Sequence, residues 1–302
     1  MPYFIITAGP TGSGKTKLID KTLDYLGISN ELFERLMIDD LVENNQNYKM
    51  QIKNIIMEEK SKCVGKSKSC NKNAYLQPSD ELFDKFRNAY FGVRDSPNCL
   101  KNNPMNCNDI NDEKLHKATS LSKNIIFEIS SNVIPKWLLS INFIPAHYTV
   151  ILSYSLVNIK NLQKRNKLRA YDAIQKFEKN DSSPAPRLPN VSNPTFNNII
   201  KNIKDTLVKI YKKCIQNYTT NISTCGNKQI NQLLLFDNNT VMQNKFDSKI
   251  GNTSSFNKTI KKSFGNLYIN DTKRKTKRNT KRKTQRNTKR KTKRKTKRNI
   301  LR

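Results

Sequence analysis

Short apolar runs bounded by polar turns recur through the first 240 residues, and amphipathic stretches lie between them. Strands that are buried on both faces give such nearly continuous apolar runs. Their alternation with helical stretches is typical of a parallel sheet with crossover helices. The expected strands lie at residues 3–8, 35–38, 124–130, 148–156 and 231–238. The sequence therefore predicts an α/β fold with a parallel sheet of five strands.

Between these runs, apolar residues recur at spacings of three and four, which predicts helices. The expected helices cover residues 15–26, 48–60, 80–90, 158–179 and 195–218. Residues 61–74 and 96–111 are rich in Cys, Asn and Lys, and we expect inserted loops there. The proline-rich segment 181–194 is expected to form a loop, because proline forbids a regular helix.

The first strand leads directly into a glycine-rich turn that satisfies the pattern G-x-x-x-x-G-K-[ST]. In such a turn, glycines allow backbone N–H groups to wrap a phosphate in conformations that a Cβ would forbid. The following helix adds its unpaired N–H groups and the positive end of its dipole. The residues of the turn are Gly9, Pro10, Thr11, Gly12, Ser13, Gly14, Lys15 and Thr16.

Two side chains of this turn have expected roles of their own. Lys15 should reach the β- and γ-phosphates, and the Thr16 hydroxyl should bind Mg²⁺. The preceding strand and the following helix are the context that supports the motif, and the spacing disfavours a dinucleotide fingerprint. We therefore expect the chain to bind a nucleoside triphosphate, ATP, together with magnesium.

Acidic residues follow or interrupt two of the predicted strands. Asp39 and Asp40 come directly after the second strand, at the sheet edge where ligands bind in open α/β folds. The alternative is that they begin a helix, with Asp40 as its cap. Glu128 stands in an otherwise apolar strand, so its carboxylate should face the active cleft, Mg²⁺ or an arginine. A glutamate at an exposed edge is the alternative for Glu128.

Arginines after the fourth strand are candidates for neutralising phosphate charge. Arg165 and Arg169 lie one helical turn apart, and Arg187 follows in the proline-rich segment. Arginines on a segment that closes over the nucleotide would stabilise a transferring phosphoryl group. Because the same helix carries Lys160, Lys164, Lys167 and Lys176, a solvated basic face is the alternative. We favour a functional role for Arg165 and not for Arg169.

In order and spacing, these segments resemble the zeta-toxin family of P-loop kinases. The resemblance extends over residues 3–238. It implies a three-layer P-loop NTPase fold with strand order 2-3-1-4-5 and transfer of phosphate from ATP to a hydroxyl group. The segments that carry the resemblance are AGPTGSGKT, MIDDLVENNQNYK, NIIFEISS, VILSYSLVNIKNLQKRNKLRA and SPAPRLPN.

The resemblance also implies roles for individual residues. Asp40 would be the catalytic base, with Asp39 as its rival, and Glu128 and Ser130 would contact the acceptor. The remaining implied roles belong to Lys15 and Thr16, which would hold ATP and magnesium, and to Arg165 and Arg187, which would stabilise the transferring phosphoryl group.

Members of the family phosphorylate a nucleotide sugar, UDP-N-acetylglucosamine. This sequence departs from the family at Ile129, where the family has a small residue, and at Ser130, where it has threonine. The loops at 61–74 and 96–111 are additional. These departures lie where the choice of acceptor is made.

The charge of the chain is concentrated at one end. Residues 272–302 form seven Thr-Lys-Arg-type tetrads that carry 18 of the 56 Lys and Arg residues and no acidic residue. The other 271 residues hold 38 basic and 24 acidic residues, a net charge of +14 out of +32. So highly charged a tail is expected to be disordered and to bind nucleic acid or another polyanion. Contact with an anionic membrane, nuclear localisation and a repeat expansion without function are the alternatives.

Cysteine spacing and hydropathy limit the remaining classes. The six cysteines show no C-x-x-C spacing, which disfavours a zinc site. We find no signal peptide and no apolar run long enough for a transmembrane helix. The sequence therefore predicts a cytoplasmic or nuclear protein with free thiols, and a Cys99–Cys107 disulfide is the alternative.

The combined prediction is a kinase domain over residues 1–240, a polar linker over 241–271 and the tail over 272–302. The kinase would move the γ-phosphoryl group of ATP onto a hydroxyl of a small molecule, for which a nucleotide sugar is one candidate. A nucleoside, nucleotide or polynucleotide-end kinase is the alternative within enzymes. The alternative from another class is a protein that senses ATP without catalysis and binds nucleic acid.

Overall fold

The computed structural model describes residues 1–62, 79–129, 144–180, 183–188, 193–215 and 230–263. The chain divides into two compact units, Met1–Phe256 and Asn257–Arg302. In the second unit, residues 257–263 are described and are helical. The predictions made for Ser130, for the tail and for most of the loop at 61–74 lie outside the described residues. Across the described ranges, none of the helices has the length and apolar character that a membrane span requires.

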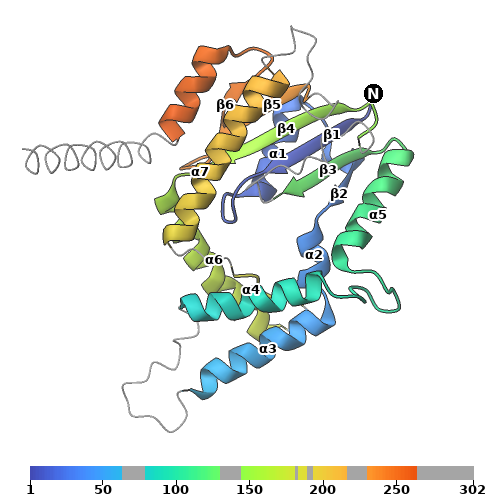
Figure 1. Cartoon of the computed structure of the whole chain (residues 1–302), viewed down its shortest axis with the longest axis vertical. Coiled ribbons are helices and arrows are strands. Elements are labelled where there is room, and N and C mark those ends of the chain that lie inside the picture. The colour runs from blue at the N-terminus through green and yellow to red at the C-terminus, as the bar shows by residue number, and fades with distance from the viewer. Residues whose placement is uncertain (63–78, 130–143, 181–182, 189–192, 216–229, 264–302) are drawn as a thin grey trace, which may run out of the picture. The chain divides into compact units, whose positions relative to one another are not determined.

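A six-stranded sheet forms the centre of the first unit, with the strand order β2-β3-β1-β4-β5-β6 (Figure 1). The first five strands pair in parallel, in the predicted order. The prediction of a purely parallel five-strand sheet is wrong, because β6 pairs antiparallel with β5. The strands are β1 (Tyr3–Ala8), β2 (Phe33–Leu36), β3 (Asn124–Ile129), β4 (Thr149–Leu156), β5 (Gln232–Asp237) and β6 (Gln243–Asp247).

The missed strand β6 lies inside the segment that the sequence assigned to a polar linker. In β6 the residues Gln243, Asn244 and Lys245 are polar, and only Phe246 and Asp247 are buried. An edge strand needs no continuous apolar run, because its outer side faces solvent. Buried Asp247 accepts hydrogen bonds from Tyr25 and Gln232, each at 2.9 Å, and so ties the edge of the sheet to helix α1 (Lys15–Leu26).

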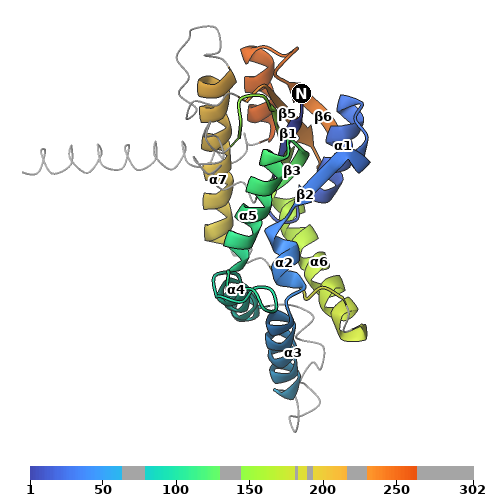
Figure 2. The same cartoon turned by 90° about the vertical axis from the view of Figure 1, so that its right-hand side faces the viewer.

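Helices cover both faces of the sheet and extend beyond it. Helix α1 lies on one face and α7 on the other, whereas α3 and α4 lie away from the sheet (Figure 2). Residues 96–111 are not a loop throughout, because α5 begins at Cys107. The remaining helices are α2 (Ile38–Glu43), α3 (Gln46–Ser61), α4 (Asp80–Arg94), α5 (Cys107–Ser120), α6 (Ile159–Lys179) and α7 (Asn193–Ile210), which continues into the π-helical turn Tyr211–Ile215.

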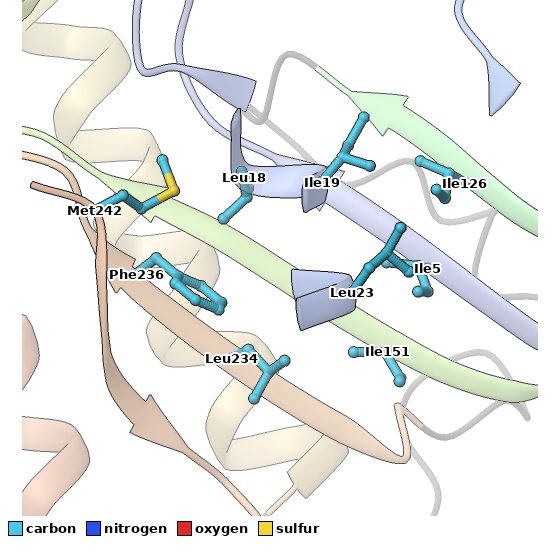
Figure 3. Close-up of a cluster of buried hydrophobic side chains, with 9 residues drawn as sticks. All are labelled: Ile5, Leu18, Ile19, Leu23, Ile126, Ile151, Leu234, Phe236 and Met242. Atoms are coloured by element: carbon cyan, nitrogen blue, oxygen red, sulfur yellow. The ribbon is translucent and has the colours of Figure 1, made fainter. Parts of the chain in front are cut away.

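An apolar core holds α1 against the sheet (Figure 3). Leu18, Ile19 and Leu23 recur at helical spacing and contact residues of four strands, and each is at most 2% exposed. Full burial of each such side chain stabilises the fold by roughly 1.5–3 kcal/mol. This packing fixes the beginning of α1 at the end of β1. The other members of the core are Ile5, Ile126, Ile151, Leu234, Phe236 and Met242.

A disulfide joins Cys99 and Cys107, whose Cα atoms lie 5.1 Å apart. The prediction of free thiols is therefore wrong for this pair. The chain folds back between the two cysteines, because the Cys99 N–H donates to the Met105 carbonyl at 3.1 Å. Asn45, the N-cap of α3, donates to the Cys99 carbonyl at 2.6 Å. The disulfide loop thereby contacts the junction between α2 and α3.

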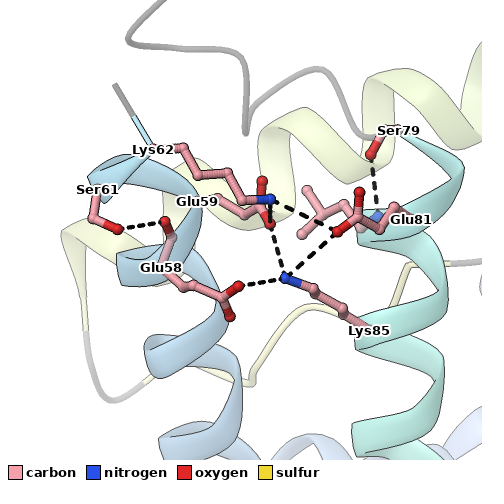
Figure 4. Close-up of polar contacts among 8 residues, drawn as sticks. Glu58, Glu59, Ser61, Lys62, Ser79, Glu81 and Lys85 are labelled. Carbon is pink, nitrogen blue, oxygen red and sulfur yellow. Dashed lines mark hydrogen bonds and ion pairs between the residues drawn. The ribbon is translucent and has the colours of Figure 1, made fainter. Parts of the chain in front are cut away.

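Charged side chains hold the end of α3 beside the beginning of α4 (Figure 4). Lys85 of α4 pairs with Glu58 at 2.7 Å and with Glu59 at 3.2 Å, both on α3. Lys62 pairs with Glu59 at 2.6 Å. Exposed ion pairs of this kind contribute about 0.2–1 kcal/mol each. The cluster therefore fixes the register of the two helices more than it stabilises the protein.

Candidate active site

The glycine-rich turn occupies residues 9–14 between β1 and α1, as the sequence predicts. Gly12 and Gly14 have φ angles of 83° and 82°, in the left-handed region that disfavours side chains. A Cβ on Gly12 would lie 2.2 Å from Asn166 Oδ1, and one on Gly14 would lie 2.6 Å from Asn238 Nδ2. The turn therefore requires glycine at both positions, for conformation and for space. Successive backbone N–H groups in such a conformation form a concave surface that can bind an anion.

Hydrogen bonds from outside the turn fix its carbonyl groups. The Ser13 carbonyl accepts from Ser155 Oγ at 2.8 Å and from Asn238 Nδ2 at 2.7 Å. The Thr11 carbonyl accepts from Asn166 Nδ2 at 3.0 Å. In a planar trans peptide the C=O and the next N–H point in opposite directions. These bonds therefore orient the N–H groups of Gly12 and Gly14 away from the surrounding side chains.

Lys15 begins α1, and its ammonium lies 3.4 Å from the Glu128 carboxylate of β3. The two side chains are only 9% and 11% exposed. Burial lowers the pKa of Lys15, whereas the nearby Glu128 carboxylate opposes that shift. Burial raises the pKa of Glu128, against the effect of Lys15. Glu128 therefore faces the glycine-rich turn and is not an exposed edge residue.

A second ion pair lies close enough to act on Lys15. Arg187 Nη1 donates to Asp39 Oδ1 at 2.5 Å. Tyr90 Oη donates to the same oxygen at 2.5 Å, and the Arg187 guanidinium lies 5.3 Å from the Tyr90 ring centre. The charges of Asp39 and Arg187 both contribute to the pKa of Lys15. The structure thus gathers Lys15, Glu128, Asp39 and Arg187 from four separate segments.

Glu43, at the end of α2, also borders this cluster. Its Oε1 lies 3.7 Å from Arg187 Nε, and its side chain is 18% exposed. Burial raises the pKa of Glu43 to about 7, although the positive charge of Arg187 opposes the shift. The cluster thus contains a carboxyl group that titrates near neutral pH.

The other predicted residues make no hydrogen bond or ion pair with the side chains of this cluster in the described part of the chain, although Asp40 and Arg169 act on it through their charge. Asp40 is exposed, in the first turn of α2 and not at its cap position, which Met37 occupies. Burial raises the pKa of the Asp40 carboxyl, the charge of Asp39 adds to this shift, and the charge of Arg187 opposes it. Arg165 is half-buried, and its Nη2 donates to the Asn238 carbonyl at 2.6 Å. Arg169 is exposed, and its charge acts on Glu43.

The segment that carries Arg187 is anchored on both sides of the arginine. The Ala185 N–H donates to the Glu43 carbonyl at 2.8 Å, and the buried Tyr48 hydroxyl donates to the Pro186 carbonyl at 2.9 Å. Ala185 and Leu188 are at most 2% exposed. These contacts hold the segment in place, whereas we expected Arg187 to lie on a segment that closes over the nucleotide.

Thr16 is exposed at the second position of α1, where its hydroxyl is accessible to a metal ion. Searching the described residues for three or more His, Cys, Asp or Glu side chains that could hold a metal finds none. A magnesium ion here would therefore depend on the Thr16 hydroxyl and on phosphate oxygens, as it does in P-loop proteins.

Several residues of the site were missed by the sequence analysis. Glu43 could have been found as the third acid of DDLVE, one helical turn after Asp39. Asn166 and Asn238 gave no signal, because an asparagine in a polar helix or after a strand is ordinary. Tyr90 was expected only as one of the residues in an amphipathic helix.

No family model matches the chain, and no curated protein matches it. The chain has a structural neighbour in a solved structure from a study of the PezAT chromosomal toxin–antitoxin system of Streptococcus pneumoniae. The two chains share 12% sequence identity with a TM-score of 0.46, over 87% of this chain and 78% of that chain. A likeness of this size says nothing about the activity of this chain.

Proposed function

We propose that the protein is an ATP-dependent phosphotransferase that moves the γ-phosphoryl group of ATP onto a hydroxyl group. A phosphate turn alone also serves switches and motors, so the turn does not decide the function. The observation that carries the proposal is the charge cluster beside the turn. It combines two cations, Lys15 and Arg187, with the carboxylates of Asp39 and Glu128. A kinase needs both kinds of group at one place.

In this proposal the turn holds the β-phosphate through its backbone N–H groups, and Lys15 binds the β- and γ-phosphates. Magnesium, bound to the Thr16 hydroxyl, would neutralise charge on the phosphate oxygens. Arg187 stabilises the negative charge of the transferring phosphoryl group. Arg165 is a second candidate for this role. It donates to the carbonyl of Asn238, whose side chain in turn donates to the Ser13 carbonyl of the turn.

The contacts favour Asp39 over Asp40 as the catalytic base. Asp39 is half-buried beside Arg187, whereas Asp40 is exposed. In the reaction, the acceptor oxygen forms a bond to the γ-phosphorus while the bond from that phosphorus to the bridging oxygen breaks. The hydroxyl proton moves to Asp39, and ADP leaves with the bridging oxygen. Glu128 and Ser130 are proposed to orient the acceptor.

The class of acceptor is proposed from the resemblance described above, which favours a nucleotide sugar. A nucleoside, a nucleotide or a polynucleotide end is the second acceptor class, and it agrees with the net charge of +14 outside the tail. The alternative from another class is a protein that senses ATP and binds nucleic acid without transfer.

The test is an acceptor screen with γ-labelled ATP and magnesium. The panel contains nucleotide sugars, nucleosides, nucleotides and oligonucleotides with a free 5′-hydroxyl. We expect label on one of these classes, and no transfer with Lys15→Ala. If ATP binds but no member of the panel acquires label, the ATP-sensing alternative is supported and the proposal fails.

A matched pair of variants tests the base. Asp39→Asn removes the proton acceptor while retaining the shape of the side chain, so transfer should fall by at least about 100-fold, the effect of losing a general base. Asp40→Asn makes the same replacement of a carboxylate by an amide at the neighbouring residue, and it should change transfer less than about threefold. ATP affinity, measured by calorimetry, should stay within a few-fold of the wild type in Asp40→Asn. Because Asp39 also binds Arg187, transfer by Asp39→Asn is compared with wild type at saturating ATP, where a change in ATP affinity has no effect. The reverse order of effects would assign the base to Asp40.

A further inference from the structure

Glu43 contacts the Arg187 segment with both its main chain and its side chain. Its carbonyl accepts the Ala185 N–H at 2.8 Å, and its carboxylate lies 3.7 Å from Arg187 Nε. The first contact places the backbone two residues before the arginine. The second contact acts on the arginine itself. No other described residue makes both kinds of contact with this segment.

The guanidinium of Arg187 is constrained on several sides. Asp39 binds it at Nη1, Glu43 lies on the Nε side, and the Tyr90 ring lies 5.3 Å away. A guanidinium is a rigid planar fork, so two anions at different nitrogens fix its rotation as well as its place. With Asp39 alone, the guanidinium would be held by one hydrogen bond and could still rotate about that hydrogen bond. Glu43 therefore determines which nitrogens remain for a further anion.

We infer that Glu43 is a positioning residue, which holds the Arg187 guanidinium in the orientation that binds the γ-phosphoryl group. This inference rests on the proposed function, because it takes the γ-phosphate of ATP as the anion that Arg187 binds. Glu43 acts through Arg187 and does not touch the reacting atoms.

The electrostatic environment of Glu43 agrees with a role other than stabilising the fold. Burial raises its pKa from 4.5 to about 7. The charged groups that act on it are Arg187, Asp39 and Asp40, with Arg169 from α6. Because the folded pKa lies above the unfolded one, the protonated carboxyl stabilises the fold fully below pH 4.5, and this contribution is lost as the pH rises through 7. At neutral and higher pH the charged Glu43 is unfavourable for folding, as is common at functional sites.

The test compares Glu43→Gln with wild type and with Glu34→Gln. Glutamine keeps the main-chain bond and the shape but carries no charge. Glu34 is the matched control. It lies on β2, away from the cluster, and its carboxylate pairs with Lys123 at 2.8 Å. The probes are β,γ-methylene ATP and ADP, whose affinities are measured by calorimetry from pH 5 to pH 8. Their ratio reports the γ-phosphate contact without any acceptor.

For wild type and Glu34→Gln, we expect the ATP analogue to bind more tightly than ADP at pH 8, and the preference to weaken as the pH falls through 7. For Glu43→Gln, the preference should be at least about tenfold smaller at pH 8, and it should change less with pH than in Glu34→Gln, for which the titration of the probes' own phosphate groups is the same. The same variant should melt at a higher temperature than wild type at pH 8 and at an equal temperature near pH 5. Glu43→Asp should retain part of the preference. Aspartate keeps the negative charge, but its shorter side chain places that charge farther from Arg187.

Two outcomes would overturn the inference. One is a preference in Glu43→Gln that equals that of wild type at every pH. The other is a wild-type protein that binds the two probes equally. A failed acceptor screen with an intact γ-phosphate preference would instead remove the proposed function and leave the contact between Glu43 and Arg187 as a determinant of nucleotide binding.

Discussion

At the scale of single residues, two glycines with similar backbone angles differ in what surrounds them. Gly12 has a φ of 83° and lies against Asn166, whereas Gly27 has a φ of 67° and no atom within 4 Å of the Cβ position. Gly27→Ala should destabilise the fold by about 1–2 kcal/mol, the cost of a left-handed alanine. Gly12→Ala adds a clash in the turn, so it should destabilise more and weaken ATP binding at least tenfold. Urea unfolding and ATP titration check the pair, and equal ATP binding in both variants would contradict the role of the turn.

The hydroxyl of Tyr90 can be removed alone and compared with the hydroxyl of another buried tyrosine, Tyr148. Tyr90→Phe removes the hydroxyl that donates to Asp39 at 2.5 Å and retains the ring beside Arg187. A buried hydrogen bond to a charged group contributes about 2 kcal/mol, so stability should fall by that amount and transfer should fall about tenfold. Tyr148→Phe removes a hydroxyl that donates to the Lys123 carbonyl at 2.8 Å, and it should lower stability alone. Thermal melts and labelled-ATP assays distinguish the two variants.

A site residue could be predicted when a local sequence pattern marks it, and not when only distant contacts bring it to the site. Lys15 belongs to a local motif, and Glu128 interrupts an apolar strand, so both were visible in the sequence. Asp39 was visible only together with Asp40, because the choice between neighbours depends on where α2 begins. Glu43 and Asn166 become part of the site through contacts with residues more than 140 positions away, which no local pattern records.

At the scale of elements, the disulfide loop before α5 gives a prediction about stability. Cys99 and Cys107 close a short loop, and such a bond stabilises by about 2–3 kcal/mol through the unfolded state. The variants Cys99→Ala, Cys107→Ala and the double variant should each lose about that amount, because each removes the same bond. Urea unfolding measures the three. Additive losses in the double variant would show that the two cysteines stabilise the fold separately.

The same scale shows which elements the sequence could reveal. Four of the parallel strands, β1, β3, β4 and β5, are buried on both faces, so their apolar runs are nearly continuous and were predicted. β2 is the short edge strand and was placed two residues late, so Ile38, the first residue of α2, was assigned to the strand. β6 was missed because four of its five residues are polar. The order of the five strands was predicted from the resemblance, since strand periodicity does not encode it.

At the scale of the whole molecule, the uneven charge predicts two separable properties. Residues 272–302 carry 18 of the 56 basic residues, whereas the cluster proposed for phosphotransfer lies between Lys15 and Arg187. Deletion of 272–302 should therefore remove most of the salt-sensitive binding to single-stranded DNA and leave phosphotransfer within about twofold of wild type. Binding titrations at several salt concentrations, together with the labelled-ATP assay, measure both properties.

The salt dependence makes this prediction quantitative. For single strands, the logarithm of the binding constant falls with the logarithm of salt by about 0.7 for each phosphate that is neutralised. A tail that contributes ten contacts would therefore lower the slope by about 7 when it is deleted. A scrambled tail of the same composition is the control, because counterion release depends on charge and not on the order of residues, and it should restore the slope. If the deleted protein keeps the original slope, the polyanion site lies on residues 1–271 and the tail is not needed for it.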